Sequence, residues 1–140
     1  MEKSYSYFCA YMADTGEDKF FSSGIYQFPI KITTKKAIRA AERLIAEKYQ
    51  LDRKMLHLTG MKGLGEAAEP VKKKKGDLPY TIFCAYVYQK NGKIMANNTM
   101  VETDFIPQAQ SELSAMEFLI KEQEKLKVDL KITDYWKVEG

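Results

Sequence analysis

Residues 4–12 follow a period of two, with tyrosines and a cysteine at the odd positions 5–11 and Phe8, Ala10 and Met12 on the other side, which is the pattern of a β-strand. Turn-forming residues follow at 13–18, and a second extended stretch at about 20–30 predicts a hairpin. From Thr33 or Thr34, either of which can cap a helix, apolar positions recur at helical spacing to about Tyr49. An apolar stretch at 55–59 predicts a third strand and completes a β-β-α-β order.

The same order of elements recurs in the second half of the chain. Phe8-Cys9-Ala10-Tyr11 returns 75 positions later as Phe83-Cys84-Ala85-Tyr86, and the apolar positions of the helix return at the same spacing. Around residues 56–59 and 130–133 the spacing is 74, which a one-residue deletion in a loop explains. We infer an internal duplication, and two copies of this length indicate a pseudo-symmetric domain rather than a solenoid.

The predicted fold class is α+β: duplicated β-β-α-β units forming a mainly antiparallel sheet, with both helices on one face. The first repeat is expected at 1–65, a basic linker at 66–79 and the second repeat at 80–140. The helices are expected to cover the face that carries Phe8, Ala10 and Met12, with Phe83, Ala85 and Val87 as its counterpart, because the small alanines allow a close approach.

The opposite face of the central strands would then stay open, and it is rich in tyrosine: Tyr5, Tyr7, Tyr11, Tyr80, Tyr86 and Tyr88. Such rings could be ordinary strand residues, an interface with a partner, or a platform for stacking bases. The preferred hypothesis is a non-enzymatic protein-binding or self-associating module. The alternative is a nucleotide or single-stranded nucleic-acid binder that combines the tyrosines with a basic run, Lys72, Lys73, Lys74 and Lys75.

Composition narrows the class of protein. The chain has 140 residues with 45% hydrophobic side chains, as in a globular domain, and no apolar run of about 18 residues that could span a membrane. Two cysteines do not form a disulfide framework, so a cytoplasmic setting is expected. Charge is uneven, since residues 1–69 carry 11 basic and 9 acidic side chains, whereas 80–140 carry 7 and 9.

Catalytic signatures are weak throughout the chain. His57 is the only histidine and is expected at the surface, while Cys9 and Cys84 are most simply sheet residues. The glycines at 60, 63 and 65 are not followed by the Gly-Lys-Ser/Thr of a phosphate-binding loop. We therefore expect no enzymatic activity, no catalytic residue, no metal and no cofactor.

The passage from Ile30 to Ile45 reads Ile-x-Ile-Thr-Thr-Lys-Lys-Ala-Ile-Arg-x-x-Glu-x-x-Ile. Together with the hairpin before it and the apolar strand after it, this passage resembles small phage or prophage β-β-α-β proteins of unassigned function. The resemblance covers each copy once and implies a non-enzymatic protein. Some phage proteins of this size bind host proteins, and others sequester signalling nucleotides. The resemblance implies these two functions only as broad expectations for a class of proteins.

Overall fold

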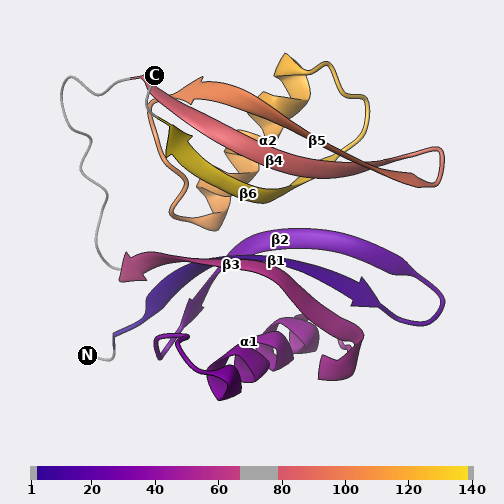
Figure 1. Ribbon diagram of the computed structural model, residues 1–140, viewed down its shortest axis with the longest axis vertical. Helices are drawn as coiled ribbons and strands as arrows, with labels where there is room; N and C mark the ends of the chain where they lie inside the picture. Colours follow the sequence, from indigo (N-terminus) through magenta and orange to yellow (C-terminus); the bar gives the residue numbers. More distant parts are fainter. Residues whose placement is uncertain (1–2, 67–78, 139–140) are drawn as a thin grey trace. The chain divides into compact units, whose positions relative to one another are not determined.

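The computed structural model describes residues 3–66 and 79–138, and the chain divides into two compact units, Met1–Glu69 and Pro70–Gly140. Each unit consists of a three-stranded antiparallel sheet and one α-helix in β-β-α-β order (Figure 1). The predicted α+β class and the duplicated units are confirmed. Only residues 66 and 79 of the predicted linker at 66–79 are among the described residues. The basic run from Lys72 to Lys75 lies outside them.

Unit 1 has the sheet order β2-β1-β3. Its elements in chain order are β1 (Tyr5–Asp14), β2 (Lys19–Phe28), α1 (Lys35–Lys48), the 3-10 turn η1 (Arg53–Met55) and β3 (Leu56–Glu66). The helix begins after Thr34, whose hydroxyl accepts a hydrogen bond from the Ala37 N–H at 3.1 Å, as the sequence predicts.

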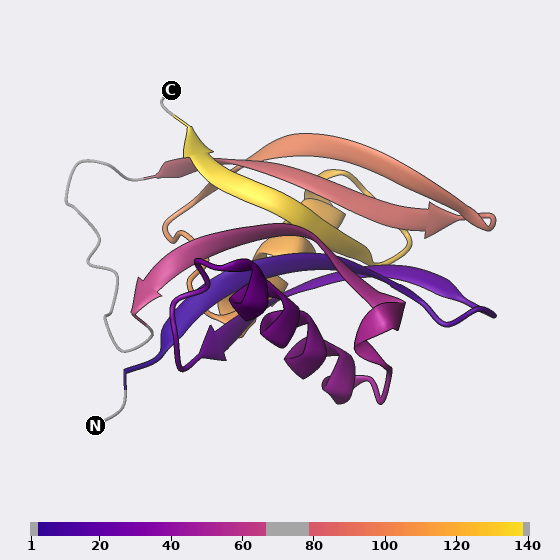
Figure 2. The same cartoon turned by 60° about the horizontal axis from the view of Figure 1, so that its bottom comes forward.

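Unit 2 repeats this arrangement with the sheet order β5-β4-β6. Its elements are β4 (Tyr80–Lys90), β5 (Lys93–Thr103), α2 (Gln110–Gln123) and β6 (Leu130–Val138). In each unit the helix lies along one face of its own sheet (Figure 2), and the covered face is the equivalent one in the two copies.

The duplication extends to the pairing of individual residues. Tyr5 pairs with Phe28 in unit 1 and Tyr80 pairs with Thr103 in unit 2, both shifted by the same 75 positions. The central strand then loses register with the last strand at one equivalent point in each copy, which leaves Thr59 and Thr133 as the extra residue of a β-bulge. The repeated spacing in the sequence therefore corresponds to a shared backbone geometry, and this geometry includes the β-bulge.

The step in spacing from 75 to 74 lies between the helix and the last strand. The two helices begin and end at positions 75 apart, whereas β3 and β6 begin at Leu56 and Leu130, 74 apart. Unit 1 forms the turn η1 in this connection, and unit 2 crosses it in one residue fewer without a helical turn. The deletion that the sequence predicts in a loop is thus located in residues 124–129.

β3 extends to Glu66, beyond the apolar stretch at 55–59 and the predicted continuation toward Leu64. A Cβ added at Gly63 would lie 3.4 Å from the Tyr7 ring, at the near end of ordinary van der Waals contact. The tyrosine hydroxyl in turn accepts a hydrogen bond from the Ile32 N–H at 2.8 Å. At Gly63, β3 therefore passes beside the ring of Tyr7.

The helices cover the sheet face opposite to the predicted one. The core of unit 1 is formed by buried residues of the other parity with residues of α1 and β3: Cys9, Tyr11, Phe28, Ala41, Ile45, Ala46 and Leu56. The corresponding buried set in unit 2 is Ile82, Cys84, Tyr86, Leu113, Met116 and Ile120. The prediction that Phe8, Ala10 and Met12 lie beneath the helix is therefore wrong.

In unit 1 the composition of α1 is consistent with this difference. α1 buries three alanines, Ala37, Ala41 and Ala46, so the small side chains that a close approach needs come from the helix. The sheet can then contribute large rings such as Tyr11, which fill the space below the alanines. Small residues on the sheet, at Ala10 and Ala85, are not required for this packing.

Candidate functional site

The six tyrosines predicted as an open face do not form one. Tyr11 and Tyr86 are each 1% exposed, and Tyr80 is also buried. Tyr5, Tyr7 and Tyr88 are half-buried. The tyrosine parity lies on the helix side of each sheet, so these residues serve mainly as core, and the expectation of an open tyrosine surface is corrected.

Burial of Tyr11 is possible because its hydroxyl finds partners inside unit 1. It shares a hydrogen bond with the Tyr26 hydroxyl, at 2.8 Å between the oxygens, and a second with the Tyr49 hydroxyl. Tyr26 comes from β2, and Tyr49 follows the last residue of α1. A buried hydroxyl with a partner costs little, and the sequence could not show a partner 38 positions away.

The three hydroxyls have shifted pKa values. Burial raises the pKa of Tyr11, and the hydrogen bonds to Tyr26 and Tyr49 raise it further. Burial also raises the pKa of Tyr26, to about 12. For Tyr49 burial acts in the same direction and is the largest single effect, but the hydrogen bonds with Tyr11, Ser22 and Tyr26 and the charge of Lys48 together outweigh it, and the pKa is lowered. These rings are stabilising parts of the core rather than acid–base groups facing a ligand.

A glutamate recurs at the same place in both copies, buried at Glu42 and half-buried at Glu117. An oxygen of the Glu42 carboxylate accepts a hydrogen bond from the Leu58 N–H at 3.0 Å, and Glu117 accepts one from the Ile132 N–H at 3.0 Å. Each bond ties the helix to the last strand next to the β-bulge. This pair is not among the residues that the sequence patterns singled out, although its spacing of 75 within an apolar helix face was a usable signal.

The surface that unit 2 leaves open is the face opposite its helix. Phe83 of β4 pairs with Met100 of β5 on one side and with Trp136 of β6 on the other, so the three side chains form a row across the sheet. Met100 is 59% exposed and Trp136 is 47% exposed. The Phe83 and Trp136 rings are stacked, with centroids 4.5 Å apart and planes at 29°. We call these three residues the aromatic row.

The aromatic row is specific to the second copy. The equivalent positions in unit 1 hold Ile25, Phe8 and Lys62, so a lysine stands where unit 2 has its tryptophan. The Lys62 ammonium lies 5.7 Å from the centre of the Phe8 ring, which is 1% exposed. Two copies of one fold therefore present different chemistry at the same three positions.

Simple alternation along β6 does not predict the exposure of Trp136. With strict alternation Trp136 would share a face with Leu130 and Ile132, both of which are buried under the helix. The bulge at Thr133 shifts the alternation by one residue, so Tyr135 turns inward and Trp136 turns outward. Only the strand pairing reveals this shift.

The reactive side chains considered in the sequence are not arranged for catalysis. Cys9 and Cys84 are fully buried, and burial raises the pKa of the Cys9 thiol to about 12, which disfavours the nucleophilic thiolate. His57 is exposed, as predicted. Across residues 3–66 and 79–138, no three His, Cys, Asp or Glu side chains come together as metal ligands. Neither described helix is long and apolar enough to cross a membrane.

Comparison with known proteins found no matching family model, no matching curated protein and no matching solved structure. The resemblance to phage or prophage proteins therefore stays a prediction. A function for the chain has to be inferred from its own geometry and chemistry, in which the aromatic row is a contiguous, partly exposed apolar surface.

Proposed function

We propose that this chain is a non-enzymatic protein-binding module that contacts its partner through the aromatic row of unit 2. The observation that carries the proposal is Trp136, half exposed and stacked on Phe83 beside the exposed Met100. Tryptophan, phenylalanine and methionine are enriched at the centres of protein interfaces. A stacked ring pair is already ordered before binding, so contact with a partner costs little side-chain entropy.

The charges around the aromatic row indicate the chemistry of the partner. Glu102 follows Met100 by two positions on β5, and Asp134 precedes Trp136 by two positions on β6, so both acids lie on the same face as the row. Residues 80–140 as a whole carry 7 basic and 9 acidic side chains. We infer a partner segment with apolar side chains flanked by lysine or arginine, which complements this charge.

Charge also disfavours a symmetric dimer through this face. Two copies related by a twofold axis would bring the acidic flanks of their aromatic rows near one another, which costs free energy. A different protein is therefore the preferred occupant. Cys9 and Cys84 are both buried and do not form a disulfide with each other, which suits a reducing compartment, so the proposed setting is cytoplasmic.

Trp136 is the only tryptophan, so its fluorescence reports directly on the proposed interface. Peptides can be selected from a random display library on the wild-type protein and counter-selected on a Trp136→Ser variant. We expect enriched sequences that combine apolar and basic residues. Synthetic versions of these peptides should shift the Trp136 emission to shorter wavelength, and added salt should weaken their binding moderately.

A matched control removes exposed apolar area elsewhere. Ile38→Ser with Leu44→Ser changes two exposed side chains of α1, 39% and 51% exposed, and should leave peptide binding unchanged. Enrichment of peptides that bind the Trp136→Ser variant equally well would contradict the proposal. If the molecular mass in solution doubled as the protein concentration rose, in the wild type but not in Trp136→Ser, the face would instead be an interface between two copies of this chain.

A further inference from the structure

A pocket of about 410 Å³ lies at the C-terminal end of α2, on the helix side of the unit 2 sheet and therefore away from the aromatic row. Its lining comes from the end of β4 and from the loop between α2 and β6: Tyr88, Lys90, Lys125, Leu126, Lys127 and Val128. Pockets of this size accommodate small organic ligands, which usually require about 300 Å³ or more. The lining combines one aromatic ring and two aliphatic side chains with three lysines.

The three lysines lack the ion pairs that would explain them as structural. Within the described part of the chain, none of Lys90, Lys125 and Lys127 has a carboxylate within salt-bridge distance. Nearby Lys121, by contrast, binds Asp129 at 2.8 Å. Three cations around one pocket attract an anion, and they stand out within residues 80–140, where the 9 acidic side chains outnumber the 7 basic ones.

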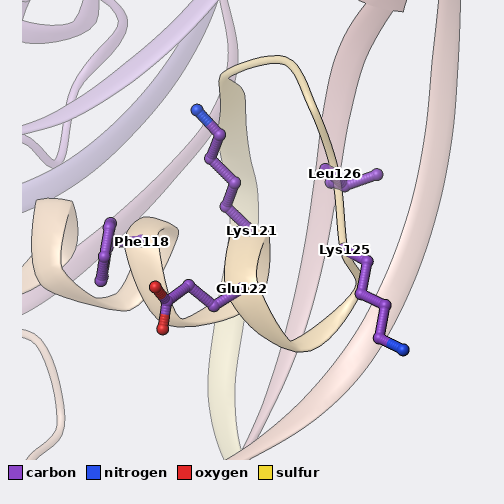
Figure 3. Close-up of a pocket in the computed structure, with 5 residues that line it drawn as sticks. All are labelled: Phe118, Lys121, Glu122, Lys125 and Leu126. Atoms are coloured by element: carbon purple, nitrogen blue, oxygen red, sulfur yellow. The ribbon is translucent and has the colours of Figure 1, made fainter.

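A shallower hollow adjoins the pocket and shares Lys125 and Leu126 with it. Figure 3 shows these two residues on the loop after α2, on the side away from Phe118 and Glu122. The carboxylate of Glu122 lines this hollow and does not line the pocket. Glu122 therefore shares a lining with Lys125 in the hollow, but it does not line the pocket together with Lys90 and Lys127.

The first copy serves as an internal control for what the fold requires. Ala13, Thr15 and Gln50 of unit 1 occupy the positions of Tyr88, Lys90 and Lys125, as the repeat spacing gives. Gln50 and Lys125 both have positive φ, 58° and 55°, and both end the helix in the same way. The backbone of the loop is thus a shared structural feature, whereas Tyr88, Lys90 and Lys125 have no aromatic or basic counterpart at the equivalent positions of unit 1.

The one-residue deletion coincides with this pocket. Unit 1 fills its longer connection with the turn η1, which contacts α1, and unit 2 has no such turn in residues 124–129. The second copy therefore differs from the first in two ways at one place: the loop is shorter, and the Tyr88 ring and three lysines line a pocket there. Neither change is needed to connect a helix to a strand, because unit 1 makes the connection without them.

From this geometry we propose that the pocket binds a small anion that carries a planar ring, with a nucleoside monophosphate as the chemical class. The ring of the ligand packs against Tyr88 and the aliphatic side chains of Leu126 and Val128. The phosphate is held by Lys90, Lys125 and Lys127 through charge-assisted hydrogen bonds. This site is independent of the aromatic row, so either proposal can fail alone.

Calorimetric titration of the full chain with three probes tests the two halves of the site. Adenosine 5′-monophosphate supplies ring and phosphate, adenosine supplies the ring alone, and inorganic phosphate supplies the charge alone. We expect the monophosphate to bind at least about tenfold tighter than either part, since each part leaves some of the lining without a partner. Binding should weaken steeply with added salt.

Variants that carry the residue types of the first copy, or neutral residues in place of lysine, then assign the contacts. Lys90→Thr with Lys125→Gln and Lys127→Gln should weaken monophosphate binding at least about 30-fold, because charge-assisted contacts are each worth up to about tenfold. Tyr88→Leu should weaken the monophosphate but not inorganic phosphate. The control, Lys35→Gln with Lys36→Gln and Lys54→Gln, removes the same charge from exposed positions of unit 1 and should have little effect.

Three results would overturn the proposal. One is monophosphate binding that the control triple weakens as much as the pocket triple, which would reduce it to general charge attraction. Another is equal affinity for monophosphate and inorganic phosphate, which would leave Tyr88 without a role. The third is no binding by a wild-type chain whose amide spectrum shows it to be folded.

Discussion

Glu42 and Glu117 stand at the same position of the two copies and make the same backbone contact, yet their electrical surroundings differ. The Glu42 carboxylate also binds Arg39 at 2.8 Å and lies 3.5 Å from Arg53. Burial by itself would raise its pKa, but the Leu58 N–H and the two arginines lower it below the usual value of 4.5. For Glu117, burial prevails over the Ile132 N–H and Lys131, and the pKa is raised.

This difference separates what the fold requires from what each copy has added. The helix-to-strand hydrogen bond is retained in both copies because it fixes α1 and α2 beside the bulged strands. The arginines are not needed for that bond, and all three lie in the first copy. The second copy instead carries the aromatic row and the lysine pocket, so divergence is concentrated in residues that the shared packing does not use.

The largest expected effects concern the two buried tyrosines. Tyr11→Ser and Tyr86→Ser should each cost about 3–5 kcal/mol of unfolding free energy, because each truncates a fully buried ring and leaves a cavity. Tyr11→Phe keeps the ring but removes the hydroxyl that forms hydrogen bonds with Tyr26 and Tyr49, and this change should cost about 1 kcal/mol. Urea unfolding followed by circular dichroism measures all three.

Tyr5→Ser is the matched control, because Tyr5 is a half-buried tyrosine at the start of the same strand as Tyr11. It should cost clearly less than Tyr11→Ser. If Tyr11→Ser and Tyr5→Ser had equal, small effects, the tyrosine parity would be a surface after all. The core described for unit 1 would then be wrong.

Repeated spacing allowed the element order and the duplication to be predicted, because strand and helix periods are local properties of the sequence. The covered face could not be predicted in the same way, since both parities of β1 are apolar: Phe8 and Ala10 on one side, Cys9 and Tyr11 on the other. The choice depends on hydroxyl partners such as Tyr49, which reach Tyr11 only in the folded unit. The exposure of Trp136 depends on a bulge that only strand pairing reveals.

Of intermediate size are the effects of neutralising the two glutamates. At pH 7, Glu42→Gln should destabilise unit 1 by about 1–3 kcal/mol, because it removes a charged acceptor from Arg39, Arg53 and the Leu58 N–H. Glu117→Gln should leave unit 2 unchanged or stabilise it, since burial already disfavours the ionised carboxylate. Amide hydrogen exchange at Leu58 and Ile132 reports on the two units separately.

The two units should also respond to acid with opposite sign. A lowered pKa means that the contribution of Glu42 is complete above pH 4.5 and is lost as the pH falls through the folded-state value. A raised pKa means that ionised Glu117 destabilises unit 2 at higher pH. That penalty disappears as the pH falls through the folded-state value toward 4.5. Protection at Leu58 and Ile132 that changed in parallel with pH, in the wild type and in both glutamine variants, would contradict this difference.

The smallest expected effect concerns the N-cap residue of each helix. Thr34 caps α1 through its hydroxyl, whereas Ala109 stands at the same position before α2 and has no side-chain acceptor. Thr34→Ala should therefore cost about 1 kcal/mol, and Ala109→Ser should stabilise unit 2 by up to about 1 kcal/mol. The backbone angles at the two positions are nearly the same, φ −124° and ψ 159° for Thr34 and φ −135° and ψ 159° for Ala109, so serine fits without strain. Thermal unfolding of the two variants and of the pair together measures the effects, which should add because the sites are on different helices.

A serine at 109 that fails to stabilise unit 2 would mean that Glu112, which already accepts a hydrogen bond from the Gln108 N–H at 3.1 Å, compensates for the missing cap. Glu112→Ala combined with Ala109→Ser distinguishes the two cases, because serine should regain its full effect once the side-chain acceptor at residue 112 is removed.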